Sequence, residues 1–279
     1  MDKKILTVQD ISCYGQCSIT VALPILSALG HETIILPTSV LSTHTSGFKN
    51  FVVKDLTDQF DAILNHWKME HITFDCLYTG YLGSENLVEY IKFIKDNFMN
   101  KGASIIIDPA MGDEGKLYPA FDLKYAKKMQ ELIPLSDIIL PNVTEACFLS
   151  DTTYVEKYDE KYIKELLLKL EAKGCKKIIL TDVSFEEKTT GVYSLIDGKY
   201  SYYKHQKIGN GLHGTGDVFS STFVGVYLLK NDIHLAIKMA ADFVYRCIVN
   251  TIDDNNHWYG VKFEKQIKHL LKGIEDESL

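Results

Sequence analysis

The sequence predicts an α/β fold in which a mainly parallel sheet lies between two layers of helices. Short β-branched apolar runs alternate with longer segments in which apolar residues recur every three or four positions. Most short runs are apolar on both faces, as strands are when helices cover both sides of a parallel sheet. Repeated alternation of this kind gives a three-layer α/β/α sandwich with right-handed crossovers. No linker, composition shift or internal repeat interrupts the 279 residues, so we expect one domain, residues 1–279.

Six runs are predicted as buried strands because Gly, Pro, Asp or Asn bounds them. In chain order they are residues 4–8, 33–36, 76–79, 104–107, 138–140 and 177–181. The predicted helices have the apolar spacing of amphipathic helices. They are residues 19–29, 55–67, 86–98, 123–133, 162–173, 215–229, 233–249 and 263–272. Residues 191–203 break the alternation and are predicted to form a hairpin, with Asp197-Gly198 at its turn.

Composition excludes several classes of protein. Hydrophobic residues make up 46% of the chain, too many for a disordered protein. The net charge of −7, without a block of lysine or arginine, disfavours nucleic-acid and anionic-membrane partners. The apolar run after the N-terminal basic pair is too short for a signal-peptide core, and no run approaches the length of a membrane span. The six scattered cysteines form no CxxC motif, and we expect reduced thiols in a cytoplasmic protein.

Polar residues and glycines gather where the predicted strands end. In open α/β sheets, ligands bind beyond the carboxyl ends of the strands. The segments at these ends are residues 9–12, 37–39, 80–84, 108–109 and 141–142. The sequence therefore predicts a ligand site along this edge of the sheet.

The sharpest local signal is Gly209-Asn210-Gly211-Leu212-His213-Gly214-Thr215-Gly216-Asp217, which leads directly into an apolar helix. Its glycines let the backbone turn tightly and approach a ligand closely. The N–H groups at the helix start then form an anion site. Asp217 either compensates the helix dipole or acts as a general base beside a bound phosphate. Neither GxxxxGK[ST] nor GxGxxG after the first strand is present, which disfavours the P-loop and Rossmann sites.

Gly214-Thr215-Gly216-Asp217 resembles the GTGD signature of the ribokinase-like superfamily, whose members transfer the γ-phosphoryl group of ATP to an alcohol. Five further segments resemble motifs of the pyridoxal/pyridoxamine kinase family and occur in the same order as in that family. They are Tyr14-Gly15, Ser42-Thr43-His44-Thr45, Thr79-Gly80-Tyr81-Leu82-Gly83-Ser84, Asp108-Pro109-Ala110-Met111-Gly112-Asp113 and Pro141-Asn142-Val143-Thr144-Glu145-Ala146. The resemblance implies a single ribokinase-like kinase domain without a separate lid.

The activity that this resemblance implies is ATP-dependent phosphorylation of the 5′-hydroxymethyl group of pyridoxal, pyridoxamine or pyridoxine. Asp217 would act as the base, and the amides of Gly214, Thr215 and Gly216 would stabilise the transferring phosphoryl group. By the same resemblance, the ATP-binding residues are Asp108, Asn142, Thr181, Gly214 and Gly216. The expected Mg²⁺ site consists of Asp108, Asp113, Asn142 and Glu145.

Simpler interpretations exist for two of these groups. Asn142 and Glu145, three residues apart at a helix start, are also the pattern of a helix cap. Asp108 before proline is also typical of a turn at a strand end. Asp182 stands where many relatives have a small hydroxyl residue, so the cation chemistry beside Thr181 stays open; the family also suggests a monovalent cation such as K⁺.

A flat heterocycle needs an apolar or aromatic slot with a few polar groups. By resemblance, the slot residues are Asp10, Thr38, Leu41, His44 and Tyr81. Asp10 stands where many pyridoxal kinases have serine, and a carboxylate binds a protonated ring nitrogen or an amino group more strongly than a hydroxyl does. The alternative role of Asp10 is to cap the turn after its strand. Four further histidines have no comparable support from the resemblance and are expected to be ordinary residues: His205, His213, His234 and His257.

Two other functions remain open. Hydroxymethylpyrimidine/phosphomethylpyrimidine kinase belongs to the same superfamily and has another small hydroxymethyl heterocycle as its substrate. A non-catalytic vitamer-binding protein on the same scaffold is the alternative from another class, and the intact Asp217 motif disfavours it. The expected partners are a B6 vitamer, MgATP and, by resemblance, a second copy of the chain in a homodimer.

Overall fold

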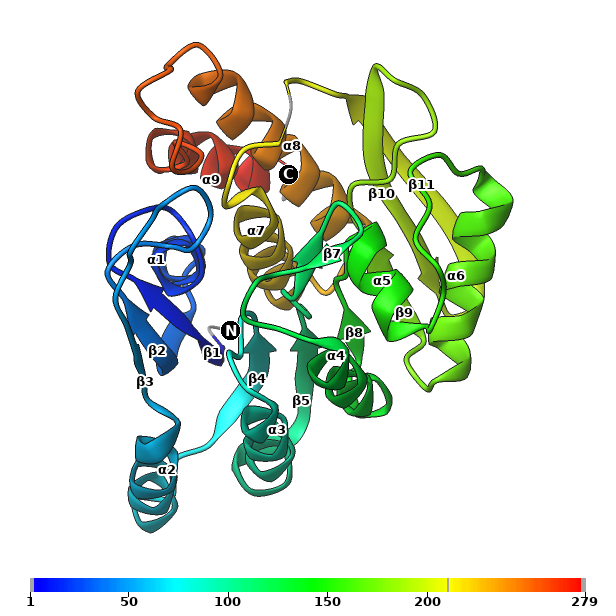
Figure 1. The fold of residues 1–279 in the computed structure, drawn as a ribbon. Coiled ribbons are helices and arrows are strands. Elements are labelled where there is room, and N and C mark those ends of the chain that lie inside the picture. Colours follow the sequence, from blue (N-terminus) through cyan, green and yellow to red (C-terminus); the bar gives the residue numbers. More distant parts are fainter. Residues whose placement is uncertain (1–2, 210, 277–279) are drawn as a thin grey trace. The chain divides into compact units, whose positions relative to one another are not determined.

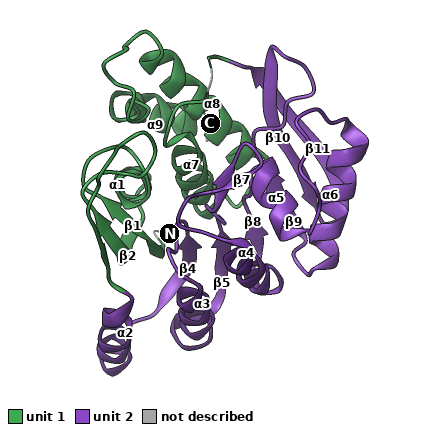
Figure 2. Ribbon diagram, in the orientation of Figure 1, with its two compact units in different colours: residues 1–56, 208–279 green, residues 57–207 purple. Residues whose placement is uncertain are grey.

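The computed structural model describes residues 3–209 and 211–276. Asn210, in the glycine-rich segment, lies outside the described residues. The chain forms two compact units, shown in different colours in Figure 2. Unit 1 consists of residues 1–56 and 208–279, and unit 2 of residues 57–207.

In unit 1, strand β1 (Lys4–Ser12) pairs in parallel with β2 (Glu32–Leu41), and α1 (Ile19–Ala28) connects them. The short strand β3 (Val53–Asp55) pairs antiparallel with β2 at the edge of the sheet. The register of β1 against β2 shifts after Gln9, so that two residues of β2 stand opposite Asp10. Irregularities of this kind reorient side chains and are common beside active sites.

The helices of unit 1 follow the glycine-rich segment. They are α7 (Thr215–Lys230), α8 (Ile233–Thr251), the 3₁₀ turn η3 (Glu264–Gln266) and α9 (Ile267–Asp276). Helix α7 packs against both α8 and α1 (Figure 1). Gly225 permits the second contact, because a Cβ there would lie 2.3 Å from a methyl carbon of Leu29. This packing buries most of α7 and fixes the direction of its N-terminus.

Unit 2 contains four parallel strands followed by an antiparallel hairpin. The strands are β4 (Phe74–Thr79), β5 (Met99–Ile107), β8 (Ile138–Ile139), β9 (Lys177–Leu180), β10 (Thr189–Ile196) and β11 (Lys199–Gln206). Their order is β4-β5-β8-β9-β10-β11, with β4 to β9 parallel and the last two strands antiparallel. Asp197 and Gly198 have positive φ angles of 48° and 79°, as the predicted turn requires.

The helices of unit 2 connect these strands. They are η1 (Thr57–Gln59), α2 (Phe60–Met69), α3 (Glu85–Phe98), α4 (Leu123–Met129), η2 (Gln130–Leu135), α5 (Val143–Leu149) and α6 (Glu160–Ala172). A small separate hairpin, β6 (Gly112–Asp113) with β7 (Lys116–Leu117), follows β5. Of the helices that the structure describes, none combines the length and the apolar character that crossing a membrane requires.

All six predicted strands and the hairpin are present. The predicted helix at residues 55–67 is wrong at its start: Asp55 pairs in β3, a 3₁₀ turn follows, and the α-helix begins at Phe60. Strand β3 and the β6–β7 hairpin were not predicted, because two- and three-residue strands carry no measurable periodicity. Whether the two units act as one domain, as expected from the sequence, stays a prediction.

Candidate active site

The glycine-rich segment of unit 1 places a helix start with no side-chain cap at the candidate site. Gly214 is the N-cap of α7, with φ at 79° in the left-handed region, and as a glycine it has no side chain to cap the helix. A Cβ on Gly214 would lie 2.0 Å from the carbonyl oxygen of Gln16. Only glycine fits this position. A Cβ on Gly216 would meet nothing within 4 Å, so the backbone there has open space in front of it.

Asp217 is half-buried in the first turn of α7. Asp217 and Asp10, near the end of β1, both act electrostatically on the Cys17 thiol. Burial raises the pKa of the Cys17 thiol well above its ordinary value, and the negative charges of Asp217 and Asp10 raise it further. The thiol therefore lies within electrostatic range of both acids. Unit 1 thus brings the predicted base and the predicted ring-binding acid together around Cys17.

Asp10 is only 4% exposed. Burial raises its pKa, while hydrogen bonds from the Ser18 and Ser12 side chains oppose the rise. The Ser12 hydroxyl donates to Asp10 Oδ2 at 2.9 Å. A buried carboxylate whose side-chain donors are hydroxyls is suited to a cationic or N–H-bearing ligand.

His44 is buried, and its two ring nitrogens bond to main-chain groups. The amide of Ser46 donates to Nδ1 at 3.2 Å, so we assign the proton to Nε2, which donates to the carbonyl of Tyr259 at 2.8 Å. Burial lowers the pKa of His44 and keeps the ring neutral. A ligand would therefore meet the ring face rather than a free nitrogen. Gly15 is required beside it, because a Cβ there would lie 2.2 Å from His44 Cδ2.

Aromatic rings that the sequence did not assign to the substrate slot lie beside His44. Phe48 packs edge-on against it at 4.9 Å, and His213 lies 5.3 Å away, between ring centroids. Phe48 also contacts Trp258 at 4.6 Å. These rings come from three loops distant in sequence, which is why motif spacing alone did not find them. The other two predicted slot residues of unit 1, Thr38 and Leu41, are buried on β2.

In unit 2, Asn142 and Glu145 form a complete capping box at the start of α5. Asn142 Oδ1 accepts from the Glu145 amide and Glu145 Oε2 accepts from the Asn142 amide, each at 2.9 Å. Glu145 Oε1 accepts from the Met111 amide at 3.0 Å, and Asn142 Nδ2 donates to the Gly112 carbonyl at 2.8 Å. The pair therefore clamps residues 111–112 onto the helix start.

Glu145 is 3% exposed and close to Asp108. Burial and then the charge of Asp108 raise the pKa of Glu145, against main-chain hydrogen bonds that include those from Asn142, Met111 and Gly112. Asp108 follows β5 and accepts from the Ala110 amide at 3.2 Å. Two neighbouring buried acids are costly to ionise together unless a cation or a proton joins them.

The structure also brings Thr181 to this group. Thr181 pairs with Asn142 in a parallel β-bridge, and its amide donates to the Pro141 carbonyl at 2.9 Å. Asp113 lies elsewhere: it is exposed on the β6–β7 hairpin, where its charge acts on Tyr154 and Asp182. Asp108, Asn142, Glu145 and Thr181 therefore form the compact part of the predicted phosphate and metal side.

The described residues contain no group of three or more His, Cys, Asp or Glu that would hold a metal ion. Mg²⁺ needs fewer protein ligands, since it commonly keeps several waters and binds one or two carboxylates together with substrate phosphates. The buried pair of Asp108 and Glu145 fits that requirement in charge and donor type. Because both oxygens of Glu145 already accept main-chain hydrogen bonds, Asp108 is the better direct ligand.

Tyr81, the substrate-side residue of unit 2, is half-buried after β4. Its ring lies 5.0 Å from that of Phe121, at an angle of 34°. Phe121 in turn stacks on Tyr125 at 3.8 Å, with an angle of 3° between the rings. Neither Phe121 nor Tyr125 was predicted from the sequence as a site residue, because each lies in a segment without a motif.

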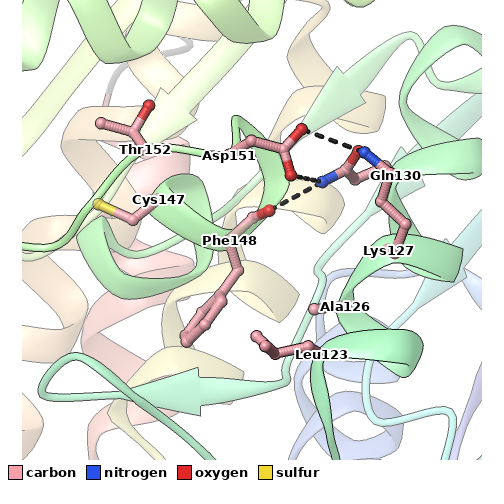
Figure 3. A pocket seen from close by; sticks show the side chains of 8 residues that line it. All are labelled: Leu123, Ala126, Lys127, Gln130, Cys147, Phe148, Asp151 and Thr152. Carbon is pink, nitrogen blue, oxygen red and sulfur yellow. Dashed lines mark hydrogen bonds and ion pairs between the residues drawn. The ribbon is translucent and has the colours of Figure 1, made fainter.

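Unit 2 also has an open pocket of about 380 Å³ that none of the predicted site residues lines (Figure 3). It is lined by Leu123, Ala126, Lys127, Gln130, Cys147, Phe148, Asp151 and Thr152. Gln130 Nε2 donates both to the Phe148 carbonyl and to Asp151, at 2.9 Å. Hydrogen bonds from Gln130, Lys173 and Lys127 lower the pKa of Asp151 to about 2. Asp151 is therefore paired with its neighbours, as in a surface ion-pair cluster.

The chain is similar to known kinases over nearly its whole length. A family model described as phosphomethylpyrimidine kinase matches residues 5–261. A solved protein from Bacteroides thetaiotaomicron, described as a putative phosphomethylpyrimidine kinase, is 36% identical, with a TM-score of 0.91 over 96% of this chain and 94% of that chain. Another crystal form with the same description contains pyridoxal.

Two other proteins extend the similarity. The solved pyridoxal kinase of Lactobacillus plantarum is 29% identical, with a TM-score of 0.89 over 98% of each chain. The hydroxymethylpyrimidine/phosphomethylpyrimidine kinase of Bacillus subtilis is 28% identical over 81% of each chain. The predicted ribokinase-like α/β fold without a separate lid is confirmed by the solved structures. The chain therefore belongs to the phosphomethylpyrimidine kinase family of the ribokinase-like superfamily, alongside the pyridoxal kinases, and is a phosphotransferase that acts on an alcohol group.

Proposed function

We propose that this protein transfers the γ-phosphoryl group of ATP to the 5′-hydroxymethyl group of pyridoxal, pyridoxamine or pyridoxine. The observation that carries the proposal is the start of α7, where an obligatory glycine cap precedes Asp217 and the same unit holds the buried Asp10. Relatives named pyridoxal kinase, and pyridoxal in a protein 36% identical to this one, support a vitamer as the acceptor.

Asp217 acts as the general base in this proposal. The substrate hydroxyl attacks the γ-phosphorus, its proton passes to the Asp217 carboxylate, and ADP leaves as the bond to its β-phosphate oxygen breaks. The N-terminal end of a helix favours the ionised form of an acid in its first turn. Asp217 is therefore suited to accept a proton at neutral pH.

The main chain at Gly214, Thr215 and Gly216 stabilises the transferring group. The transition state of phosphoryl transfer is loose and spreads negative charge over the phosphoryl oxygens. Helix-start N–H groups that no side chain caps are preorganised donors for such charge. The open space in front of Gly216 lets a phosphate reach them.

In this proposal, residues of unit 2 bind the nucleotide and the metal. Asp108, Asn142 and Thr181 face the ATP phosphates, while Glu145 holds the loop at residues 111–112 and Asp113 contributes longer-range charge. Bound Mg²⁺ would neutralise charge on the β- and γ-phosphates. A monovalent cation such as K⁺ is proposed from the family resemblance alone.

By the family resemblance, the proposed ring-binding residues are His44, Thr38 and Leu41 in unit 1 and Tyr81 in unit 2. Asp10 contacts the ring nitrogen of the vitamer. The raised pKa of Asp10 falls back when a cation binds, since an opposite charge favours the ionised form. A protonated pyridine ring supplies that charge.

The alternative acceptor is a hydroxymethylpyrimidine or its phosphate. The description of the family and the relative from Bacillus subtilis support it. An aminopyrimidine also offers N–H donors to Asp10. A non-catalytic vitamer-binding protein remains the third candidate.

A substrate panel separates these candidates. The purified protein is incubated with MgATP and each of pyridoxal, pyridoxamine, pyridoxine and hydroxymethylpyrimidine, and ADP and the phosphate ester are quantified. We expect the phosphate ester from the B6 vitamers, and a higher kcat/KM for them than for hydroxymethylpyrimidine. Preference for the pyrimidine by tenfold or more would establish the alternative, and binding without any ester would establish the vitamer-binding protein.

Homodimer formation and a cytoplasmic location are further parts of the proposal. Exposed apolar residues at the edge strand β3, namely Phe51, Val52 and Val53, support a second copy as a partner. The six cysteines are all free, which is compatible with a reducing compartment. Light scattering of the purified protein tests the first point, and cell fractionation tests the second.

A further inference from the structure

The hydroxyl of Tyr125 is buried and has no hydrogen-bond partner among residues 3–209 and 211–276. The residue is 3% exposed, and α4 holds it firmly because Asp122 caps the helix by accepting from the Tyr125 amide at 2.9 Å. A buried hydroxyl without a partner is costly, so native structures usually satisfy it with an ordered water. Tyr125 therefore marks a place where water or another small polar group belongs.

A column of three rings connects Tyr125 with the substrate side. Phe121 stacks on Tyr125 at 3.8 Å and contacts Tyr81 at 5.0 Å, between ring centroids. Tyr125 is buried and cannot move without disturbing Phe121, which contacts Tyr81. The orientation of the Tyr81 ring thus depends on Phe121 and Tyr125.

Helix α4, which carries Tyr125, packs against α5, which carries Glu145. Burial raises the pKa of Tyr125, and the charges of Tyr81 and Glu145 raise it further. The hydroxyl is therefore protonated and is a donor at any physiological pH. Glu145, the acceptor within its electrostatic range, holds the main chain at Met111.

Two more unpaired hydroxyls lie at the ends of the loop that carries Tyr81. Within the described part of the chain, Thr79 Oγ1 at the end of β4 and Ser84 Oγ at the start of α3 are buried and have no partner. The main chain of Thr79 bonds to that of Asp108, and a salt bridge between Lys124 and Glu85 joins the starts of α4 and α3. Buried hydroxyls without a partner, such as these two and that of Tyr125, are suited to bound water.

We propose that Tyr125 is a positioning residue whose hydroxyl, through buried water, connects Tyr81 on the substrate side with the Glu145 carboxylate that holds residues 111–112. The inference rests on the proposed function, because it concerns how the acceptor ring is placed. Its consequence is that acceptor binding at Tyr81 and the position of the phosphate-side loop are coupled within unit 2.

The variant Tyr125→Phe tests the connection, since it keeps the ring column and removes only the hydroxyl. We expect KM for pyridoxal to rise by about 3- to 10-fold, the effect of one hydrogen bond, with kcat changed by less than about twofold. The dissociation constant of pyridoxal, measured by calorimetry without ATP, should rise by the same factor. A merely structural hydroxyl without a partner predicts the opposite: unchanged KM and an equal or higher Tm.

A double-mutant cycle with Tyr81→Phe shows whether the two hydroxyls act through one network. If they do, the double variant is no worse than the more affected single variant; additive effects would overturn the proposal. A crystal structure of the protein should show an ordered water within hydrogen-bond distance of Tyr125 Oη. A crystal structure without an ordered water at Tyr125 Oη would overturn the proposal as well.

Tyr162→Phe is the matched control in the same unit. Its hydroxyl has protein partners, donating to the Thr153 carbonyl at 2.7 Å and lying 3.1 Å from Cys147 Sγ. Its removal should lower Tm and leave KM unchanged. Wild-type protein in the same assay keeps the two proposals distinguishable: no ester from any vitamer refutes the proposed function, whereas normal wild-type turnover with an unaltered Tyr125→Phe refutes only this inference.

Discussion

Helices α5 and α7 both have an acid three residues after the N-cap, yet the two acids are used differently. At α5, Asn142 and Glu145 cap each other, and Glu145 is buried with both oxygens accepting main-chain hydrogen bonds. At α7, the cap is Gly214, which has no side chain to return the interaction, and Asp217 stays half-buried. The identity of the cap residue thus distinguishes Glu145, which holds main-chain groups, from Asp217, the proposed base.

This contrast predicts which measurement each substitution changes. An acid that completes a capping box contributes to the free energy of unfolding, because its removal leaves buried N–H groups unpaired. An acid at a glycine cap contributes less to folding and leaves the helix-start N–H groups available to a ligand. Rates should therefore respond at α7, and stability at α5.

The largest expected effect belongs to Asp217→Asn. Loss of the base should lower kcat by about 10²- to 10⁴-fold, while Tm changes by no more than a few degrees. ADP release and thermal unfolding measure the two quantities. Normal turnover in this variant would remove Asp217 from the mechanism.

Asp232→Asn is the control for that substitution. Asp232 caps α8 by accepting from the amides of His234 and Leu235. Asparagine is also a good cap, so both Tm and kcat should stay near the wild-type values.

Glu145→Gln should have the next largest effect, and mainly on stability. Both oxygens of Glu145 accept N–H bonds, so the amide of glutamine must point an N–H group at a main-chain N–H. We expect the free energy of unfolding to fall by about 2–3 kcal/mol, as measured by urea denaturation. A variant as stable as the wild type, with only its rate reduced, would show that Glu145 resembles Asp217 after all.

Gly214→Ala should cost about 1–3 kcal/mol of stability, because alanine at φ 79° is strained and its Cβ meets the Gln16 carbonyl oxygen. Gly216→Ala serves as its partner variant. Its Cβ meets no protein atom within 4 Å, so the fold should be retained while KM for ATP rises. Equal Tm losses in the two variants would contradict the assignment of open space at Gly216 to a phosphate.

The smallest expected effect is the pH dependence of Asp10. Its folded-state pKa lies above the ordinary value of 3.8, so the folded protein binds this proton more tightly than the unfolded chain does. Stability is therefore lost as pH rises through the raised pKa. Asp10→Asn should have a higher Tm than the wild type at pH 7, and the difference should shrink as pH falls toward 4. A difference that grows in acid would show that Asp10 is stabilised as a carboxylate.

Asp10→Ser provides the matching functional measurement. If Asp10 contacts the heterocycle, kcat/KM should fall more for the acceptors that carry a protonated ring nitrogen or an amino group. The ranking of pyridoxal, pyridoxamine and pyridoxine would then differ from that of the wild type. An unchanged ranking would leave Asp10 a strand-end residue only.

The sequence predicted most of the fold because long periodic segments and strand-end punctuation are local properties. The segments that escaped prediction are those whose structure depends on distant partners. Strand β3 exists only because residues 53–55 pair with β2, and the β6–β7 hairpin has only two residues in each strand. Because Asp55 pairs with β2 as part of β3, it cannot begin the helix that the apolar spacing predicted at residues 55–67.

The roles of the candidate site residues were inferred from family motifs and stay a prediction. The motifs indicated Asp217, Glu145 and His44 by their resemblance to family segments. They did not indicate that His44 has both nitrogens bonded to the main chain, nor that Phe121 contacts both Tyr125 and Tyr81. Those facts depend on contacts between loops and on burial, which no spacing in one sequence encodes.

The placement of Cys17 gives the protein an internal reporter of charge. A thiol reacts with alkylating reagents as its thiolate, so its labelling rate follows its pKa. Because the charges of Asp217 and Asp10 both raise that pKa, neutralising either acid should speed the labelling of Cys17, which peptide mass spectrometry resolves from the other cysteines. A single sulfur atom would then report the ionisation of the proposed base in a resting enzyme, without substrate or turnover.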